Sequence, residues 1–421
     1  PFESSAATGV DGNQTQGGAS ASGAAYVFER TGQNWRQVAY LKASNTAPVN
    51  YFGASVAVSG DTVVVGAPFE SGGGQGVNTS QTQGLAWSSG AAYVFVKQGQ
   101  TWSQQAYLKA HNAEAFAQFG RSVAIWGDTV LVGAPFERYV GVGVNSHAPP
   151  GAPSGAAYAF YRRGGIWNQQ AYLKASNTGA GNAFGMAVAV SATHAVVGAP
   201  FESSAASGVD GNQSQYGATN AGAAYVFGQY RGTWGQVAYL KASNTAVGNQ
   251  FGAAVAAYGD AVVVGAPNEG GGSGAAYVFA ATGSRWIQQA YLKASNARQG
   301  NAFGTAVAFD KNTIAVGAPY EQGLSTGVNG SQTQSSWPFN GGAVYVFERI
   351  GGDWRQDAYL KASKTDPDQS FGMSVGVSES MFVVGAPYES GSATGVNGSQ
   401  VQGGALFSGA VYAFAQGPSS N

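Results

Sequence analysis

The sequence contains no cysteine, so disulfide bonds and thiolate metal ligands are excluded. Charged residues make up only 10% of the 421 residues, against about 25% in an average soluble protein. The formal net charge of −1 argues against nucleic-acid binding, which needs a basic surface. No stretch approaches the roughly 18 continuous apolar residues of a membrane-spanning helix. We therefore expect neither nucleic-acid binding nor membrane insertion.

Glycine and aromatic residues are plentiful instead. Glycine accounts for 65 of 421 residues, without the three-residue period of collagen. Aromatic residues make up 12%, which supplies ample apolar surface for a core. The low charge and the absence of thiols favour a secreted or cell-surface protein. The small net charge also gives little repulsion between copies, which favours self-association.

One unit is repeated along the chain. Six times, a Phe-Gly pair is followed 14 residues later by Gly-Ala-Pro. The pairs begin at Phe52, Phe119, Phe184, Phe251, Phe303 and Phe371, and the triplets at Gly66, Gly133, Gly198, Gly265, Gly317 and Gly385. A fixed period indicates a repeat architecture, and each residue is therefore interpreted by whether it recurs. Residues present in every unit are expected to build it, and function is expected where the units differ.

Each unit predicts four short strands and no helix. In the second unit, strand A (52–58) alternates, and strand B (62–65) is a β-branched run typical of a strand buried on both faces. A long polar B–C loop precedes strand C (90–95), and strand D (102–109) follows. A four-stranded sheet with two apolar faces must be covered on both sides, and radial stacking of such sheets achieves this.

The sequence therefore predicts an all-β protein, a β-propeller with four-stranded antiparallel blades. Strands A, B and D occur six times and strand C seven times, which makes six blades and one spare strand C, with seven blades as the alternative. We expect a single domain over 1–421. Its units are 1–51 (partial, strands C and D), 52–118, 119–183, 184–250, 251–302, 303–370 and 371–421 (partial, strands A to C). Pro1-Phe2-Glu3 matches Pro68-Phe69-Glu70, so we expect that the sequence begins inside a repeat as a processed product.

Phe-Gly, Gly-Ala-Pro and the Gly-Ala-Ala/Val-Tyr-Val/Ala-Phe of strand C together resemble the FG-GAP repeat of integrin α-subunit propellers and many secreted bacterial proteins. The resemblance implies an extracellular propeller; family members include adhesion receptors, lectins and domains appended to enzymes. Many integrin-type units carry a calcium loop in the A–B hairpin. Here that hairpin is as short as Ser59-Gly60-Asp61, too poor in carboxylates for calcium. We predict no metal ligands or cofactor, with calcium in the long loops left open.

The B–C loops are the candidate binding surface. The alternation of strands places them on one face, and most share Gly-Val-Asn/Asp. The candidate ligand or partner residues are Asp11, Asn78, Trp87, Asn145, Asp210, Asn329, Trp337 and Asn397. Their amide and carboxylate groups could bind a sugar, a peptide or a cation, and the two indoles could stack on a ligand. The alternatives are turns whose side chains satisfy the loop backbone, and indoles buried under neighbouring loops.

No catalytic residues are predicted. The glutamates two residues after each Pro recur in every unit, so we expect them to cap backbone N–H groups. The three histidines are scattered, and no Ser-His-Asp arrangement stands out. We therefore expect a non-enzymatic extracellular propeller for adhesion, recognition or assembly, which binds protein or glycan at the loop face. The spare strand C suggests a homo-oligomer or filament formed by strand exchange. The alternatives are a lectin and an enzyme with its site at the channel mouth.

Overall fold

The computed structural model describes residues 1–146, 148–335, 339–379, 381–401 and 404–415. In these residues the chain forms 25 strands and one short helix, α1 (Glu269–Gly272). Strands of type A are β3 (Ser55–Ser59), β7 (Ser122–Trp126), β11 (Ala187–Val190), β15 (Ala254–Tyr258), β19 (Ala306–Asp310) and β23 (Ser374–Ser378). Strands of type B are β4 (Thr62–Ala67), β8 (Thr129–Ala134), β12 (His194–Ala199), β16 (Ala261–Ala266), β20 (Thr313–Ala318) and β24 (Met381–Ala386).

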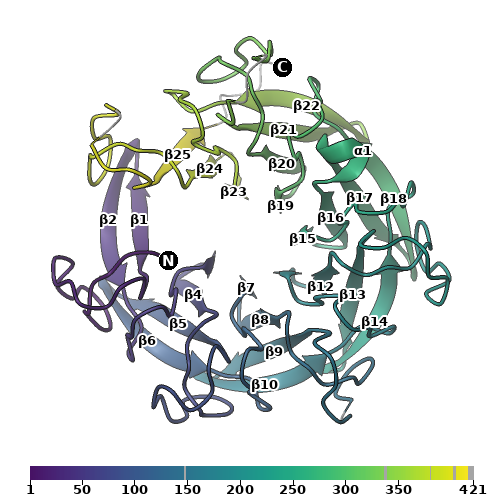
Figure 1. The fold of residues 1–421 in the computed structure, drawn as a ribbon, viewed down its shortest axis with the longest axis horizontal. Coiled ribbons are helices and arrows are strands. Elements are labelled where there is room, and N and C mark those ends of the chain that lie inside the picture. The colour runs from purple at the N-terminus through teal and green to yellow at the C-terminus, as the bar shows by residue number, and fades with distance from the viewer. Residues whose placement is uncertain (147, 336–338, 380, 402–403, 416–421) are drawn as a thin grey trace. The chain divides into compact units, whose positions relative to one another are not determined.

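Strands of type C are β1 (Ala25–Thr31), β5 (Ala91–Gln98), β9 (Ala156–Arg163), β13 (Ala223–Tyr230), β17 (Ala275–Thr282), β21 (Ala343–Ile350) and β25 (Ala410–Ala415). Strands of type D are β2 (Asn34–Leu41), β6 (Thr101–Leu108), β10 (Ile166–Leu173), β14 (Thr233–Leu240), β18 (Arg285–Leu292) and β22 (Asp353–Leu360). Figure 1 shows the strands of one sheet following one another in this order, for example β15 to β18.

The fold class predicted from the sequence is confirmed: the chain is an all-β, six-bladed propeller with four-stranded antiparallel blades. Five sheets are complete and have the order A-B-C-D. The terminal strands form a two-stranded sheet, β1–β2, and a three-stranded sheet, β23–β24–β25. Together these two sheets contain all four strand types, with type C present twice. Both copies are paired, β1 with β2 and β25 with β24.

The chain divides into two compact units. The first comprises Pro1–Ala199 and Tyr225–Val237, and the second comprises Pro200–Ala224 and Ala238–Asn421. Each is built from the same kind of sheet. The contacts described below lie within one unit or the other.

The recurring glycines allow consecutive sheets to approach closely. Gly120, of the second Phe-Gly pair, has a φ of +88° and donates its N–H to the carbonyl of Gly133, 3.0 Å away. In the preceding sheet, a Cβ added at Gly66 would lie 2.0 Å from the carbonyl oxygen of Gly120. Any side chain there would collide with backbone, so the Phe-Gly and Gly-Ala-Pro motifs recur because adjacent backbones touch at both.

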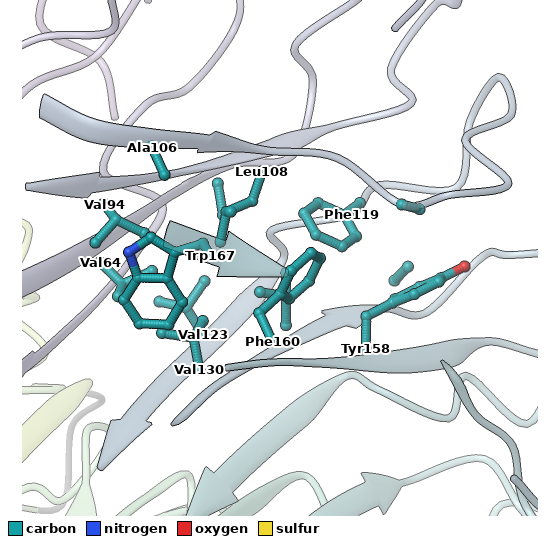
Figure 2. Packing of buried hydrophobic residues seen from close by; sticks show 14 of the residues in the cluster. Val64, Val94, Ala106, Leu108, Phe119, Val123, Val130, Tyr158, Phe160 and Trp167 are labelled. Carbon is teal, nitrogen blue, oxygen red and sulfur yellow. The ribbon is translucent and has the colours of Figure 1, made fainter. Parts of the chain in front are cut away.

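The core lies between the faces of consecutive sheets. Figure 2 shows Val64, Val94 and Leu108 of sheet β3–β6 packing with Phe160 and Trp167 of sheet β7–β10. These side chains are almost fully buried. Burial of each stabilises the fold by about 1.5–3 kcal/mol. The sheets are therefore held by side chains that repeat in every unit, which leaves the loops free to differ.

Candidate functional site

A lysine–glutamate ion pair recurs in six of the repeats, and in most of them both side chains are buried. Lys109 Nζ is 2.9 Å from Glu70 Oε2, and both side chains are 0% exposed. Glu70 Oε1 also accepts the backbone N–H of Gly72 at 2.8 Å, as the predicted cap does. Lys109 donates a second hydrogen bond to Ser89 Oγ at 2.6 Å. The equivalent pairs are Lys42–Glu3, Lys174–Glu137, Lys241–Glu202, Lys293–Glu269 and Lys361–Glu321.

An asparagine from the preceding repeat completes the ion-pair cluster. Asn112 Nδ2 donates to Glu137 Oε1 at 3.3 Å, and the hydroxyl of Tyr158 donates to Asn112 Oδ1 at 2.8 Å. The hydroxyl of Tyr172 donates to the same carboxylate at 2.8 Å. This cluster therefore joins consecutive repeats through a carboxylate whose two oxygens are both hydrogen-bonded, and Asn45, Asn244 and Asn296 bond Glu70, Glu269 and Glu321 in the same way. The Lys-Ala-Ser/His-Asn segment after strand D carries the signal for this role, which our sequence analysis missed.

The electrostatics of the cluster follow from its burial. Burial lowers the pKa of Lys109, and the ion pair with Glu70 opposes that shift. Burial raises the pKa of Tyr291 to about 12, helped by its hydrogen bond to Glu269. The tyrosine hydroxyls therefore stay protonated over the physiological range and act as donors. Such an arrangement holds the fold together.

The recurring Asn/Asp of the B–C loops contacts the outer edge of strand D. Asn78 Oδ1 accepts the backbone N–H of Tyr107 at 2.9 Å, and the N–H of Asn78 donates to the carbonyl of Tyr107 at 2.8 Å. Its φ is +51°, and Val77 forms an antiparallel bridge with Leu108. The loop thus covers an edge that would otherwise be open to other chains. The same paired bonds are made by Asp11, Asn145, Asp210 and Asn329.

Two of the predicted residues differ from this set. Asn397 is exposed and has a φ of +54°, but its sheet ends at β25 and contains no strand of type D in the described residues. Trp337 lies outside the residues that the structure describes. A ligand-binding role for the Asn/Asp side chains stays a prediction, and in five of them the side-chain oxygen already accepts a backbone N–H.

Among the predicted residues, Trp87 is the aromatic one whose exposure the structure describes. Its side chain is 66% exposed, and its carbonyl accepts the N–H of Phe116 at 2.7 Å. Phe116, which the sequence analysis missed, is 65% exposed. Leu85, in the same loop as Trp87, is also exposed. The structure thus joins a B–C loop and the following D–A connection by a backbone hydrogen bond, and both segments carry exposed apolar side chains.

Phe116 also departs from its equivalents in the other repeats. It lies three residues before a Phe-Gly pair, where three units have glycine, and its φ is +67°. The equivalents are Val49, Gly181, Gly248, Gly300 and Asp368. A bulky residue in this left-handed conformation is an outlier and carries strain. Comparison of the repeats with one another would have revealed this position from the sequence.

Phe116 borders a hollow of about 420 Å³ with Ala115, Gln118, Phe136, Arg138 and Pro153. Arg138 Nε donates to the carbonyl of Gly151 at 3.0 Å, and the backbone N–H of Arg138 donates to Glu114 Oε1 at 2.6 Å. Within the described residues, the two terminal guanidinium nitrogens of Arg138 have no hydrogen-bond or ion-pair partner. The hollow therefore combines exposed aromatic rings with an available cation.

A second hollow, of about 500 Å³, lies at the A–B turns of the same unit and contrasts with the first. Its cations are engaged. Arg162 Nε is 2.6 Å from Asp128 Oδ1, and Lys97 forms an ion pair with Glu29. This hollow is lined by residues that hold one another in place, and it offers no unpaired charge from these two side chains.

Two further properties concern metals and membranes. Over the described part of the chain, no group of three or more His, Cys, Asp or Glu side chains is arranged to hold a metal ion. None of the helices in that part is both long and apolar enough to cross a bilayer. The expectation of no cofactor, with calcium in the long loops left open, stays a prediction.

Comparison with known proteins gives one family. A search of curated proteins found no match. The sequence profile of the FG-GAP repeat matches six segments, 35–95, 102–160, 167–227, 234–279, 286–347 and 354–414. Each segment runs from strand D of one sheet to strand C of the next, so it includes the glycine contacts described above. The matches cover most of the sequence, and the chain therefore belongs to the FG-GAP repeat family.

Proposed function

We propose that this chain is a non-enzymatic, extracellular recognition module that binds partners at its B–C loop face, in adhesion or assembly. The observation that carries the proposal is the exposed apolar group of Leu85, Trp87 and Phe116. Scattered exposed apolar residues are ordinary, but adjacent ones that do not recur between repeats indicate a contact surface. Membership of the FG-GAP family supports a protein-interaction or adhesion role.

The state of the carboxylates supports a non-enzymatic function. In the described residues, the recurring buried glutamates from Glu70 to Glu321 are each paired with a lysine. A general acid or base needs a group that can reach a substrate and exchange a proton with it. The competing reading, an enzyme with its site at the channel mouth, would require an acid or histidine outside these clusters.

Two narrower functions can be tested beside the first. A lectin would use the same loop face, and the exposed indole of Trp87 supports ring stacking on a sugar. Self-association would use sheet edges: in the described strands, β1 pairs only with β2, and β25 pairs only with β24. Unpaired edges template the addition of strands. A sedimentation mass equal to that of the monomer at every concentration would reject self-association.

The binding proposal is tested with the immobilised full chain. A panel of secreted and cell-surface proteins and a glycan array are applied in parallel. We expect at least one specific binder whose signal falls with Trp87→Ala, while unfolding is unchanged. The absence of any binder on both panels, or turnover of an applied substrate, contradicts the proposal.

A further inference from the structure

Two non-recurring residues, Phe116 and Arg138, line one hollow in the first compact unit, and the backbone N–H of Phe116 donates to the carbonyl of Trp87. We infer that the hollow lined by Phe116, Phe136 and Arg138 binds an extended acidic peptide segment of a partner protein. An apolar side chain of that segment enters the hollow, and a nearby carboxylate binds the guanidinium of Arg138. The inference rests on the proposed recognition function and specifies its site and the chemistry of the partner.

The aromatic walls supply the first part of the argument. Phe136 follows Pro135 and is 36% exposed, and most other units also have an aromatic residue at its position. Phe116 is an aromatic residue at its position in this unit alone; it is 65% exposed to water, and it has the strained positive φ that Val49 and Asp368 share at the equivalent positions. Neither its strain nor its exposure stabilises the free chain. A partner that covers the ring recovers the burial, as in interface hot spots built from aromatic residues and arginine.

Arg138 supplies the charge. It occupies the position after the recurring glutamate, where four other units have serine, at Ser4, Ser71, Ser203 and Ser390. Its Nε bond to Gly151 fixes the guanidinium, and its terminal nitrogens lack partners in the described residues. Glu114 accepts the backbone N–H of Arg138. Burial raises the pKa of the Glu114 carboxyl and the charge of Arg138 opposes that shift, but the two side chains form no direct ion pair. A fixed guanidinium with two free nitrogens matches a carboxylate in bidentate geometry.

The composition of the hollow favours a peptide over a sugar. Ala115, Phe116, Phe136 and Pro153 form most of its lining, and Gln118 and Arg138 are the two polar members. A pyranose presents hydroxyl groups around its ring and would leave several of them against apolar walls, at a cost. An apolar side chain followed by a carboxylate satisfies both parts of the lining. In the A–B hollow, by contrast, Arg162 is already paired with Asp128.

The test uses the full chain and a synthetic peptide array. Each hexapeptide carries one Leu, Phe or Trp and one Asp or Glu within two residues of it, and a matched array replaces the acid by its amide. We expect binding to acidic peptides, weaker by at least tenfold on the amide array. Phe116→Gly and Arg138→Ser should each weaken binding at least tenfold. Both introduce residues that other repeats carry at these positions, so the fold should tolerate them.

Phe201→Ala is the matched control. Phe201 occupies the position of Phe136 in the next repeat, where Gly181 and Ser203 replace the two distinctive residues. This variant should bind as the parent does. The inference is overturned if no peptide binds, if Phe116→Gly and Arg138→Ser bind as well as the parent, or if glucuronic or sialic acid displaces the peptides by taking the same site as a preferred ligand. If a protein from the panel binds the parent, Phe116→Gly and Arg138→Ser equally well, the proposed recognition function is supported but this hollow is not its binding site.

Discussion

Replacement of Lys109 by methionine is expected to be among the most destabilising single changes in the chain. Methionine preserves the apolar stem and removes the ammonium group, so the carboxylate of Glu70 loses its cation while both positions stay inaccessible to water. Glu70 keeps its bond to the N–H of Gly72 and one to Asn45 Nδ2 at 2.9 Å. Loss of one partner from a buried ion pair costs about 3–5 kcal/mol. We expect the free energy of unfolding to fall by that amount.

A double-mutant cycle separates the pair from its surroundings. Glu70→Gln alone leaves the Lys109 ammonium buried with Ser89 and without a counter-ion, and should cost a similar amount. The double variant leaves no buried charge and should cost less than the sum of the two single variants by several kcal/mol, about 2–4. The free energies come from equilibrium urea unfolding followed by tryptophan fluorescence.

The matched control comes from a repeat with a shorter loop. Lys293 and Glu269 are 2.7 Å apart, nearly the same separation, but the lysine side chain is 27% exposed. Water can solvate the remaining charge there, so Lys293→Met should cost clearly less than Lys109→Met. The reasoning is refuted if the two lysine variants are equally costly, or if the Glu70 and Lys109 changes add within about 0.5 kcal/mol.

Three further predictions follow from the same contacts. Gly120→Ala should lower the free energy of unfolding by at least about 2 kcal/mol, because the new Cβ would lie 2.2 Å from the carbonyl oxygen of Ala91 at a φ of +88°; Gly127→Ala, with nothing within 4 Å, should cost clearly less in the same urea assay. Because the pKa of Tyr291 is raised from 10.0 to about 12, its contribution to stability is present below pH 10 and is lost as the pH rises towards 12. The loss of stability caused by Tyr291→Phe should therefore shrink as the pH rises from 10 towards 12 in the same urea assay, and a loss that stays constant over this range would count against this. Trp87→Ala should change the free energy of unfolding by less than about 0.5 kcal/mol, and a larger loss would show that the indole packs in the core.

The fold was predictable because the repeat imposes it. Alternation in strand A, the β-branched run of strand B and the turn residues between them recur with a fixed period, so an error in one unit is corrected by the others. The cap formed by Glu70 was predictable for the same reason. Its pairing with Lys109 was not, because the two residues lie far apart in sequence and the burial that brings them together depends on the loop above.

The candidate site was only partly predictable. Asn78 was predicted as a ligand-binding residue because of its amide group. In the structure this side chain accepts a hydrogen bond from the edge of strand D, and the sequence does not show that the loop lies beside that edge. Trp87 was found because it breaks the repeat. Phe116 and Arg138 also break it, but they stand in connections between strands, where variation looks unremarkable. Their importance depends on a shared hollow, which only the three-dimensional arrangement defines.

The central claim is that recurring side chains build the blades and that non-recurring ones on the loop face are free for recognition. The most direct measurement compares the free energies of unfolding of Asn78→Ala and Phe116→Gly under identical conditions. Asn78→Ala removes a bond to the edge of strand D and should lose about 1–2 kcal/mol. Phe116→Gly relieves a strained backbone and should leave stability unchanged or raise it. The claim would be contradicted if the free energy of unfolding is unchanged by Asn78→Ala and falls strongly with Phe116→Gly.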